Sequence, residues 1–561
     1  MMMLVVVKFI PLTILLTTVF SAIDVKPNQP VLVNIKGQSN NSITLRNVTA
    51  DISYVTCQVH SQTKNLTLSS TPVPRVGKSL TGGDIGIVTV LEPDQTEVTW
   101  YLQSNHSQDV QVLLAVFLMS KNEPLAGGCN LEFSLEDDAN LRVSYTTTKN
   151  LVEFQLSNIP LRNRSAHPSC EEKSSQNMLE YSIYVKYLSE NDFTSGEYFS
   201  TMKQMMTAED VMTNGLLLSK TTSKDTVQKP EFMAASYTGT GAVYNMVVKA
   251  TTPSGVTMAA YFPQVTYSCN IQQREGCKMY GVFWLTAAVV LGIVGLFLTF
   301  LGHRFFRTGN FLCAFLGFCI IFYSVLSLYT DQTDTVVLVM TFILGVVCAA
   351  LWVGMYEFVG VPALSVLLSG LVAGYIISSV VFYTQFGNLS YWDSSFNYGL
   401  AFACGVLVIP VFILSYTKVL NIVSCAFIGS YLIILVPDIF LYTGMKYIIV
   451  NSIRHSTDVD YIKVVNTGPF LLPEIILACA WFLVCVFGAF VQFYRDWGQP
   501  DFPQSSRRCG RKLQPGYNRI PARYSVESEG DSDREPDERS PLLRPARNTG
   551  HHRERVLAAP T

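Results

Sequence analysis

Charged residues are scarce in this sequence of 561 residues. Asp, Glu, Lys and Arg make up only 15% of it, compared with roughly 25% in an ordinary soluble domain. A chain with so few charges cannot easily solvate its whole surface, so part of it is expected to face lipid. The 40 Lys and Arg residues are balanced by 42 Asp and Glu residues, which excludes the basic surface that nucleic-acid binding requires.

Histidine is also rare. The chain has seven histidines, none of them in a long apolar run, whereas zinc hydrolases that act inside the bilayer need histidine ligands at that depth. Gly77-Lys78-Ser79 resembles the end of a phosphate-binding loop, but Pro72 stands where the first glycine of such a loop should be. The sequence therefore predicts no catalytic residue, no metal site and no cofactor, and a protein that is not an enzyme.

Long apolar runs dominate the second half of the chain. Seven of them have the length, about 20 residues, that crosses a bilayer as a helix. They lie near residues 280–301, 311–329, 336–356, 361–383, 398–417, 422–442 and 470–493. Met1–Ala22 contains Lys8, an apolar stretch and then two small residues, which is typical of a signal peptide. An exported amino terminus followed by seven crossings places the carboxyl terminus in the cytosol.

Residues 23–279 are polar and contain short apolar runs bounded by turn residues, a pattern that predicts β-strands. The expected strands lie near residues 30–35, 51–59, 85–91, 98–102, 110–118, 152–156, 181–187 and 242–250, and one helix is expected near residues 200–218. These strands imply one large or two smaller antiparallel β-sandwiches, with the division, if there are two, near residues 158–174. The predicted organisation is a signal peptide (1–22), a β-sandwich-like ectodomain (23–279), a seven-helix transmembrane bundle (280–493) and a disordered cytosolic tail (494–561).

Glycosylation sequons support export of the β-rich segment, because Asn-x-Ser/Thr is modified only in the secretory lumen. Any single sequon is weak evidence for export, but several in one segment together support it. The predicted acceptors are Asn40, Asn47, Asn65, Asn105 and Asn163, with a sixth, Asn388, in a loop between two apolar runs.

Cysteines also indicate an oxidising compartment. Their number in the β-rich segment allows two disulfides with one thiol left over. The candidates are Cys57, Cys129, Cys170, Cys269 and Cys277. Their pairing stays open at this point, although the short spacing between the last two would allow a small closed loop.

Two carboxylates, Asp438 and Glu474, lie inside the predicted spans. Each is about four residues from the exported end of its run, or about 6 Å deep in a helix, and each follows a proline. Two carboxylates at one depth could share a proton or hold a cation, as in a coupled transporter or channel. The favoured interpretation is that both are hydrated among the lipid headgroups.

A seven-helix receptor for G proteins is a second alternative, and its motifs are missing. The third run ends at Tyr356-Glu357 with no Asp/Glu-Arg-Tyr, and the seventh has no Asn-Pro-x-x-Tyr. Small residues instead suggest close helix packing, because Gly370 and Gly374 are four residues apart. Packing inside the bundle is the preferred interpretation of that spacing, and a dimer interface is the alternative.

The tail, residues 494–561, has little apolar clustering and is expected to be disordered. Glu538-Arg539-Ser540-Pro541-Leu542-Leu543 has the form of an acidic dileucine sorting signal, in which an adaptor binds the carboxylate and buries both leucines. Tyr517-Asn518-Arg519-Ile520 is a weaker Tyr-x-x-apolar signal. Clathrin-adaptor complexes are therefore expected partners, and the protein is expected at the cell membrane, cycling through endosomes and lysosomes.

Several segments, in order, resemble one known family. They are Gly127-Gly128-Cys129-Asn130, Gly302-His303-Arg304-Phe305-Phe306-Arg307, Gly387-Asn388-Leu389, Ile428-Gly429-Ser430-Tyr431 and the sorting signal 538–543. With the signal peptide and the sequons, they resemble the transmembrane seven superfamily member three family, and the membrane half is similar to transmembrane protein 198. The resemblance implies a non-enzymatic membrane adaptor or regulator that supports cell survival under stress, through negative regulation of programmed cell death, and hormone secretion of the insulin type. It also leaves room for an unidentified ligand or protein partner at the ectodomain, beside the lipid bilayer.

Overall fold

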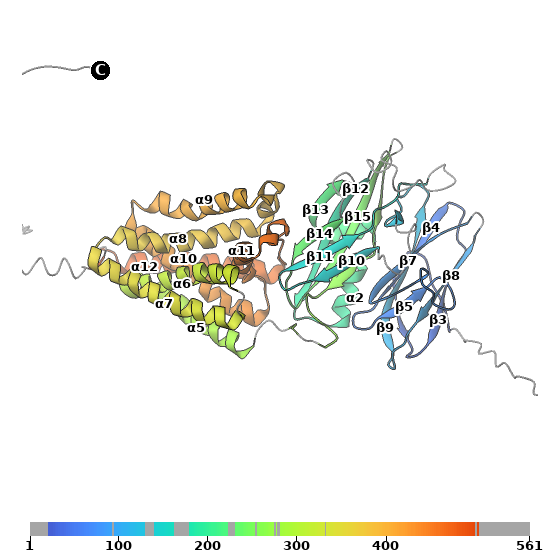
Figure 1. The fold of residues 1–561 in the computed structure, drawn as a ribbon, viewed down its shortest axis with the longest axis horizontal. Coiled ribbons are helices and arrows are strands. Elements are labelled where there is room, and N and C mark those ends of the chain that lie inside the picture. Colours follow the sequence, from blue (N-terminus) through green and yellow to red (C-terminus); the bar gives the residue numbers. More distant parts are fainter. Residues whose placement is uncertain are drawn as a thin grey trace, which may run out of the picture. The chain divides into compact units, whose positions relative to one another are not determined.

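The computed structural model describes residues 21–92, 95–129, 140–161, 179–222, 230–252, 255–273, 276–277, 281–330, 333–499 and 502–503. Within these ranges the first half of the chain forms β-strands and the second half forms helices (Figure 1). Residues 1–20, which hold most of the predicted signal peptide, and residues 504–561, which hold the predicted sorting signals, lie outside the described residues.

The first β-sandwich consists of residues 21–120. One sheet has the strand order β1-β3-β8-β5-β6 and the other β2-β9-β4-β7. The strands are β1 (Ser21–Asp24), β2 (Val31–Ile35), β3 (Asn40–Arg46), β4 (Ile52–His60), β5 (Leu66–Ser69), β6 (Ser79–Gly82), β7 (Asp84–Val90), β8 (Glu97–Gln103) and β9 (Val110–Ser120). Alternation places Val98, Trp100 and Leu102 of β8 in one buried core with residues of both sheets.

The second β-sandwich consists of the described residues between 140 and 266. Its sheets have the orders β10-β11-β14 and β13-β12-β15-β16, with β17 paired to β15. The strands are β10 (Leu141–Tyr145), β11 (Lys149–Phe154), β12 (Leu179–Glu190), β13 (Leu216–Thr222), β14 (Glu231–Ala235), β15 (Thr240–Thr252), β16 (Gly255–Ala260) and β17 (Gln264–Thr266). Two short helices, α2 (Ser195–Lys203) and α3 (Ala208–Asn214), follow β12.

The predicted division near residues 158–174 is wrong. β9 ends at Ser120, and the strands on both sides of residues 158–174 belong to the second sandwich. Phe154 of β11, for example, packs against Tyr181 of β12 with their ring centroids 5.5 Å apart. The two sandwiches therefore meet after Ser120, because the strands before and after the predicted division share one core.

The helix predicted near residues 200–218 is only partly correct. α2 begins earlier, at Ser195, and ends at Lys203, and a separate helix, α3, begins after Thr207. The Thr207 hydroxyl accepts a hydrogen bond from the backbone N–H of Asp210 at 3.1 Å, which is a helix N-cap. Residues 216–218 are already in strand β13.

Seven helices are long and apolar enough to cross a membrane, so the predicted number is confirmed for the described residues. α8 and α10 are the most buried of them and α9 the least. The helices are α5 (Val282–Leu301), α6 (Phe306–Tyr329), α7 (Asp334–Val359), α8 (Pro362–Tyr383), α9 (Ser395–Ile413), α10 (Thr417–Leu441) and α12 (Leu472–Arg495).

Small residues in α8 and α9 serve packing inside the bundle, as the sequence favoured. A methyl group at Gly374 of α8 would lie 2.0 Å from the carbonyl oxygen of Val406 of α9. One at Gly405 of α9 would lie 2.7 Å from the Ser378 hydroxyl of α8. The two helices can approach this closely only because neither glycine carries a side chain.

Candidate functional site

The segment between α10 and α12, residues 442–471, forms the candidate site, and we call it the docking loop. It contains a further helix, α11 (Tyr447–Thr457), and a 3-10 turn, η4 (Val459–Lys463). The sequence analysis did not predict α11, which is only 11 residues long and has polar residues on one face. The docking loop connects the bundle to the second sandwich through the contacts described below.

Asp438 holds the start of the docking loop. Its carboxylate accepts hydrogen bonds from the Thr443 hydroxyl at 2.6 Å, the Met445 N–H at 2.7 Å and the Lys446 N–H at 3.0 Å. The chain can turn back onto Asp438 because Tyr442, at the end of α10, has a left-handed backbone with φ of 55°. The side chain is fully buried, and these donors take the place of water.

Glu474 holds the other end of the docking loop. Its carboxylate accepts hydrogen bonds from the Leu471 N–H at 2.9 Å and from the Gly444 N–H at 3.2 Å. It therefore caps the start of α12 and ties it to the turn that follows α10. Glu474 is only 4% exposed. The interpretation that Asp438 and Glu474 are hydrated among headgroups is wrong, because loops that fold back over them supply backbone donors instead.

Lys446 connects the docking loop to the second sandwich. Its ammonium donates to the Glu190 carboxylate of β12 at 2.7 Å and also to the Thr443 carbonyl oxygen. Both charged side chains are 7% exposed. Burial raises the pKa of Glu190, and the nearby Lys446 ammonium opposes that rise. A buried ion pair of this kind is tolerated only while both partners are present.

Arg454 of α11 makes a second charged contact. One guanidinium nitrogen donates to the Ser236 carbonyl oxygen at 2.8 Å, and another donates to the Thr147 carbonyl oxygen at 3.2 Å. Both acceptors belong to turns of the second sandwich, beside β14 and β11. Because Arg454 is itself buried, these carbonyl oxygens replace the water that its charge would otherwise bind.

Aromatic rings fill the space between these charged contacts. The Tyr237 ring lies 4.6 Å from the Tyr447 ring, edge to face. Asn451 of α11 donates to the Tyr237 hydroxyl at 3.3 Å and accepts from the Tyr461 hydroxyl at 3.2 Å. Tyr447, Tyr461 and Val464 belong to the same buried core as the strands of the second sandwich. The joint between the docking loop and the second sandwich is therefore a continuous core and not a flexible linker.

The docking loop also extends a β-sheet. Val465 lies parallel to Ala234 of β14, with the Val465 N–H donating to the Met233 carbonyl oxygen at 3.0 Å. The Ala235 N–H in turn donates to the Val465 carbonyl oxygen at 3.1 Å. This bridge covers part of the β14 edge, which would otherwise present unpaired backbone groups.

His455 connects the docking loop to α9. Its ring stacks on Tyr398 at 4.3 Å and meets the edge of Tyr461 at 4.8 Å, while Nε2 faces the Asn466 amide. Burial lowers the pKa of His455 from its ordinary value of 6.5 to about 4. The imidazole is consequently neutral at pH 7.

Asn388, one of the predicted sequons, is part of the same network. It lies in the 3-10 turn η2 (Gln385–Asn388), which precedes a second turn, η3 (Ser390–Asp393). Its amide accepts from the Asn466 N–H at 2.7 Å and donates to the Thr467 hydroxyl at 2.9 Å. Asn47, Asn65 and Asn105 are exposed and Asn40 is half-buried, whereas Asn163 lies outside the described residues.

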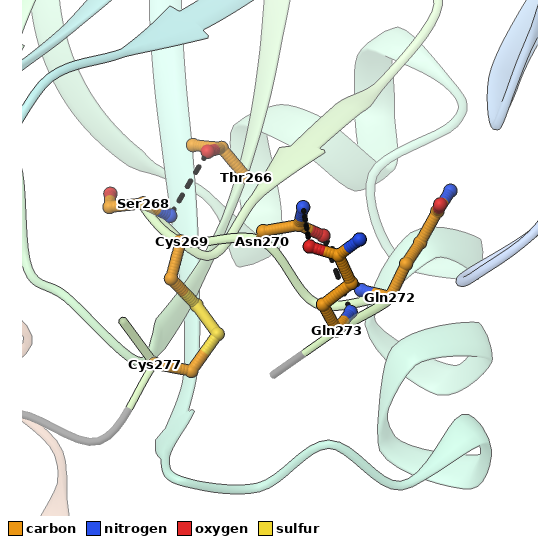
Figure 2. Close-up of a disulfide and its surroundings, with 7 residues drawn as sticks. All are labelled: Thr266, Ser268, Cys269, Asn270, Gln272, Gln273 and Cys277. Carbon is orange, nitrogen blue, oxygen red and sulfur yellow. Dashed lines mark hydrogen bonds between the residues drawn. A yellow bond between two sulfur atoms is a disulfide. The ribbon is translucent and has the colours of Figure 1, made fainter. Parts of the chain in front are cut away.

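Cys269 and Cys277 form a disulfide, as their spacing allowed (Figure 2). It closes the segment between β17 and α5, where Asn270 also accepts from the backbone N–H of Gln272 at 3.1 Å. Cys57 is a buried free thiol and Cys129 is disulfide-bonded. Cys170 lies outside the described residues.

The remaining predictions concern the tail, metal binding and the end of the signal peptide. The sorting residues Glu538, Leu542, Leu543, Tyr517 and Ile520 lie outside the described residues. Within the described ranges, no three His, Cys, Asp or Glu side chains are arranged to hold a metal ion. The predicted end of the signal peptide, Ala22, falls inside β1, which pairs with β3 from Ser21 onward, so that boundary stays a prediction.

Comparisons with known proteins match most of the chain. Residues 21–119 match the model "TM7SF3-like, N-terminal immunoglobulin-like domain", residues 124–272 match "TM7SF3-like, second immunoglobulin-like domain", and residues 288–493 match "TM7S3/TM198-like domain". The chain is 31% identical to rat transmembrane 7 superfamily member 3 over 493 residues, covering 85% of this chain and 86% of the relative. The mouse and human proteins of that name are each 30% identical, over 499 and 493 residues, with 86% and 85% of this chain and 87% and 86% of the relative covered.

Proposed function

Because this chain belongs to the transmembrane 7 superfamily member 3 family of multi-pass membrane proteins, we propose that it is a non-enzymatic membrane regulator. In this role its two immunoglobulin-like sandwiches and its seven-helix bundle act as one coupled unit. The observation that carries the proposal is the docking loop, which shares a buried core with the second sandwich. A flexible linker would let the sandwich move independently, whereas a packed joint transmits a change on one side to the other.

The physiological role that we propose follows from the family resemblance. It is support of cell survival under stress, by restraint of programmed cell death, together with support of insulin-type hormone secretion. In this scheme the sandwiches face the extracellular or lumenal side and meet a ligand or partner protein there. The bundle carries the resulting change to the cytosolic side.

A trafficking role belongs to the same proposal. Clathrin adaptors would bind the dileucine signal of the cytosolic tail and cycle the protein between the cell surface and endosomes or lysosomes. Replacing Leu542 and Leu543 with Ala is expected to increase the fraction of protein at the cell surface, measured by surface biotinylation. An unchanged surface fraction would contradict this part of the proposal.

The coupling can be tested by breaking the joint without touching either unit's own core. Lys446→Met removes the charge that reaches Glu190, and Lys463→Met is the matched control, because Lys463 lies in the same loop but is exposed. Each variant is expressed at equal surface level in cells that lack the protein, and survival under stress is measured. We expect Lys446→Met to lose most of the protection and Lys463→Met to retain it.

A locked variant distinguishes coupling from simple stability. Ala234→Cys with Val465→Cys places two thiols at neighbouring bridge positions of β14 and the docking loop, where a disulfide would fix the joint. Oxidation of this double variant in the Lys446→Met background should restore protection if coupling is what matters. Protection that survives Lys446→Met, with the joint shown to be open, would refute the proposed function.

A further inference from the structure

A cavity lies between the two sandwiches, away from the docking loop. Its volume is about 240 Å³. The first sandwich contributes residues of β4 and β9, and the second contributes residues of α3 and β16 and the segments beside them. Known sites for drug-sized ligands are somewhat larger, about 300 Å³ and above, so this cavity has the size for a small ligand.

The walls of the cavity are mainly apolar. Phe117 of β9 and Phe262 line it from the two sandwiches, and Met206 and Met258 are among the other apolar residues of the lining. Methionine side chains are flexible and make favourable contacts with aromatic rings. Such a wall fits the apolar body of a ligand, and in particular a ring.

The polar end of the cavity is formed by Asn140 and Glu123. Asn140 is 8% exposed, and its Nδ2 is directed to the Ala126 carbonyl oxygen at 3.5 Å. Its Oδ1 lies against Gly127 and is covered by the protein. A ligand in the cavity therefore reaches Glu123 and not this oxygen.

Glu123 supplies the acceptor that a ligand can reach. It lies in the short segment between the sandwiches and lines the cavity. One carboxylate oxygen accepts from the Ser120 N–H at 2.7 Å, and carboxylates have room for further donors. Burial raises the pKa of Glu123, which is the expected effect of removing its charge from water without a cationic partner.

The cavity walls are held in place by a separate polar contact between the sandwiches. Asp84 of β7 accepts from the Tyr198 hydroxyl at 2.6 Å and from the Val265 N–H at 3.1 Å. Gln62 also donates to the Tyr267 hydroxyl at 3.2 Å. The cavity is therefore formed before any ligand enters, as is usual for small-molecule sites.

We propose that this cavity binds a small ligand made of an apolar, ring-containing body and one ammonium group. The ring lies against Phe117, Phe262 and the two methionines, and the ammonium donates to the Glu123 carboxylate. Because the ligand contacts both sandwiches, its binding stabilises their arrangement by mass action. This inference does not depend on the proposed coupling through the docking loop.

The test uses phenethylamine as the probe and the full chain in lipid nanodiscs. Binding is measured by ligand-detected NMR titration at pH 7.5, with phenethyl alcohol as the neutral analogue. We expect saturable binding of phenethylamine and at least tenfold weaker binding of the alcohol. Empty nanodiscs give the background from partition into lipid. Absence of saturable binding, or equal binding of amine and alcohol, would overturn the proposal.

Variants locate the binding. Glu123→Gln is expected to weaken phenethylamine binding at least fivefold, and Ala208→Phe, which fills the cavity, should abolish it. Glu209→Gln is the control, because Glu209 is an exposed carboxylate of the same helix, α3, that does not line the cavity. Binding that is equal in the wild type, Glu123→Gln and Ala208→Phe refutes the site.

Discussion

Replacing Lys446 with Met should open the joint between the docking loop and the second sandwich. The change keeps the length of the side chain but leaves the Glu190 carboxylate, 7% exposed, without its ionic partner. Removing one member of a buried ion pair typically costs about 3–5 kcal/mol. Glu190 can relieve part of this by taking up a proton, because burial already raises its pKa. We therefore expect a loss of about 2–4 kcal/mol in the local stability of the joint.

Hydrogen exchange measures this loss directly. The backbone amides of Val465 and Ala235 are hydrogen-bonded across the joint, so the free energy of opening the joint sets their exchange rates. A loss of 2–4 kcal/mol corresponds to exchange that is roughly 30 to 1,000 times faster. Amides in the middle of α10 should be unaffected, and so should the joint amides of Lys463→Met.

A double variant separates the ion pair from packing. Lys446→Met combined with Glu190→Leu replaces both charges with apolar groups, so neither is left buried alone. We expect the double variant to recover at least half of the stability lost by Lys446→Met. Unchanged exchange in Lys446→Met would refute the argument, because it would mean that the ion pair does not hold the joint closed.

Three further predictions concern the same end of the bundle. Burial lowers the pKa of His455 to about 4, so its neutral imidazole stabilises the docking loop above pH 6.5, and this stabilisation is lost as the pH falls. Hydrogen exchange should therefore show that the free energy of opening the docking loop decreases by about 2 kcal/mol between pH 7 and pH 5. The His455→Gln variant should not show this decrease. Asn388, whose amide is hydrogen-bonded, should carry no glycan, so that Asn388→Gln leaves the mass of the glycosylated protein unchanged; a drop of one glycan would contradict this. Asp438→Asn with Glu474→Gln should loosen the docking loop without altering proton or cation flux in reconstituted vesicles, whereas lost flux would support a transporter.

The membrane half of the fold could largely be predicted from the sequence. Length and apolarity are sufficient to identify a spanning helix, and all seven runs became helices with ends shifted by a few residues. α11 was missed because its 11 residues are too short for a span and its polar face includes Arg454 and His455. Its apolar residues pack in two places that local pattern does not show: Ile448 lies in the core of the bundle, and Tyr447 lies against Tyr237, which is more than 200 residues away in the chain.

The β-rich half was predictable where strands are long or alternate clearly. The runs near residues 98–102 and 110–118 became β8 and β9, but the short strands β5 and β6, of which β6 is an edge strand, were not predicted. The boundary between the sandwiches was misplaced because pairing of β11 with β14, about 80 residues later, cannot be read from local pattern. Likewise, the depth of Asp438 in its helix could be predicted from the sequence. The turn that brings three hydrogen-bond donors to its carboxylate could not.

The β14 edge has a consequence for biosynthesis. Its neighbour Val465 is translated more than 200 residues after β14, and six spanning helices must be made in between. During this interval the second sandwich is incomplete, and the unpaired backbone groups of the β14 edge can associate with other chains. Chaperones should therefore remain bound to the nascent protein until the last loop emerges, and a secreted fragment that ends before the first span should aggregate.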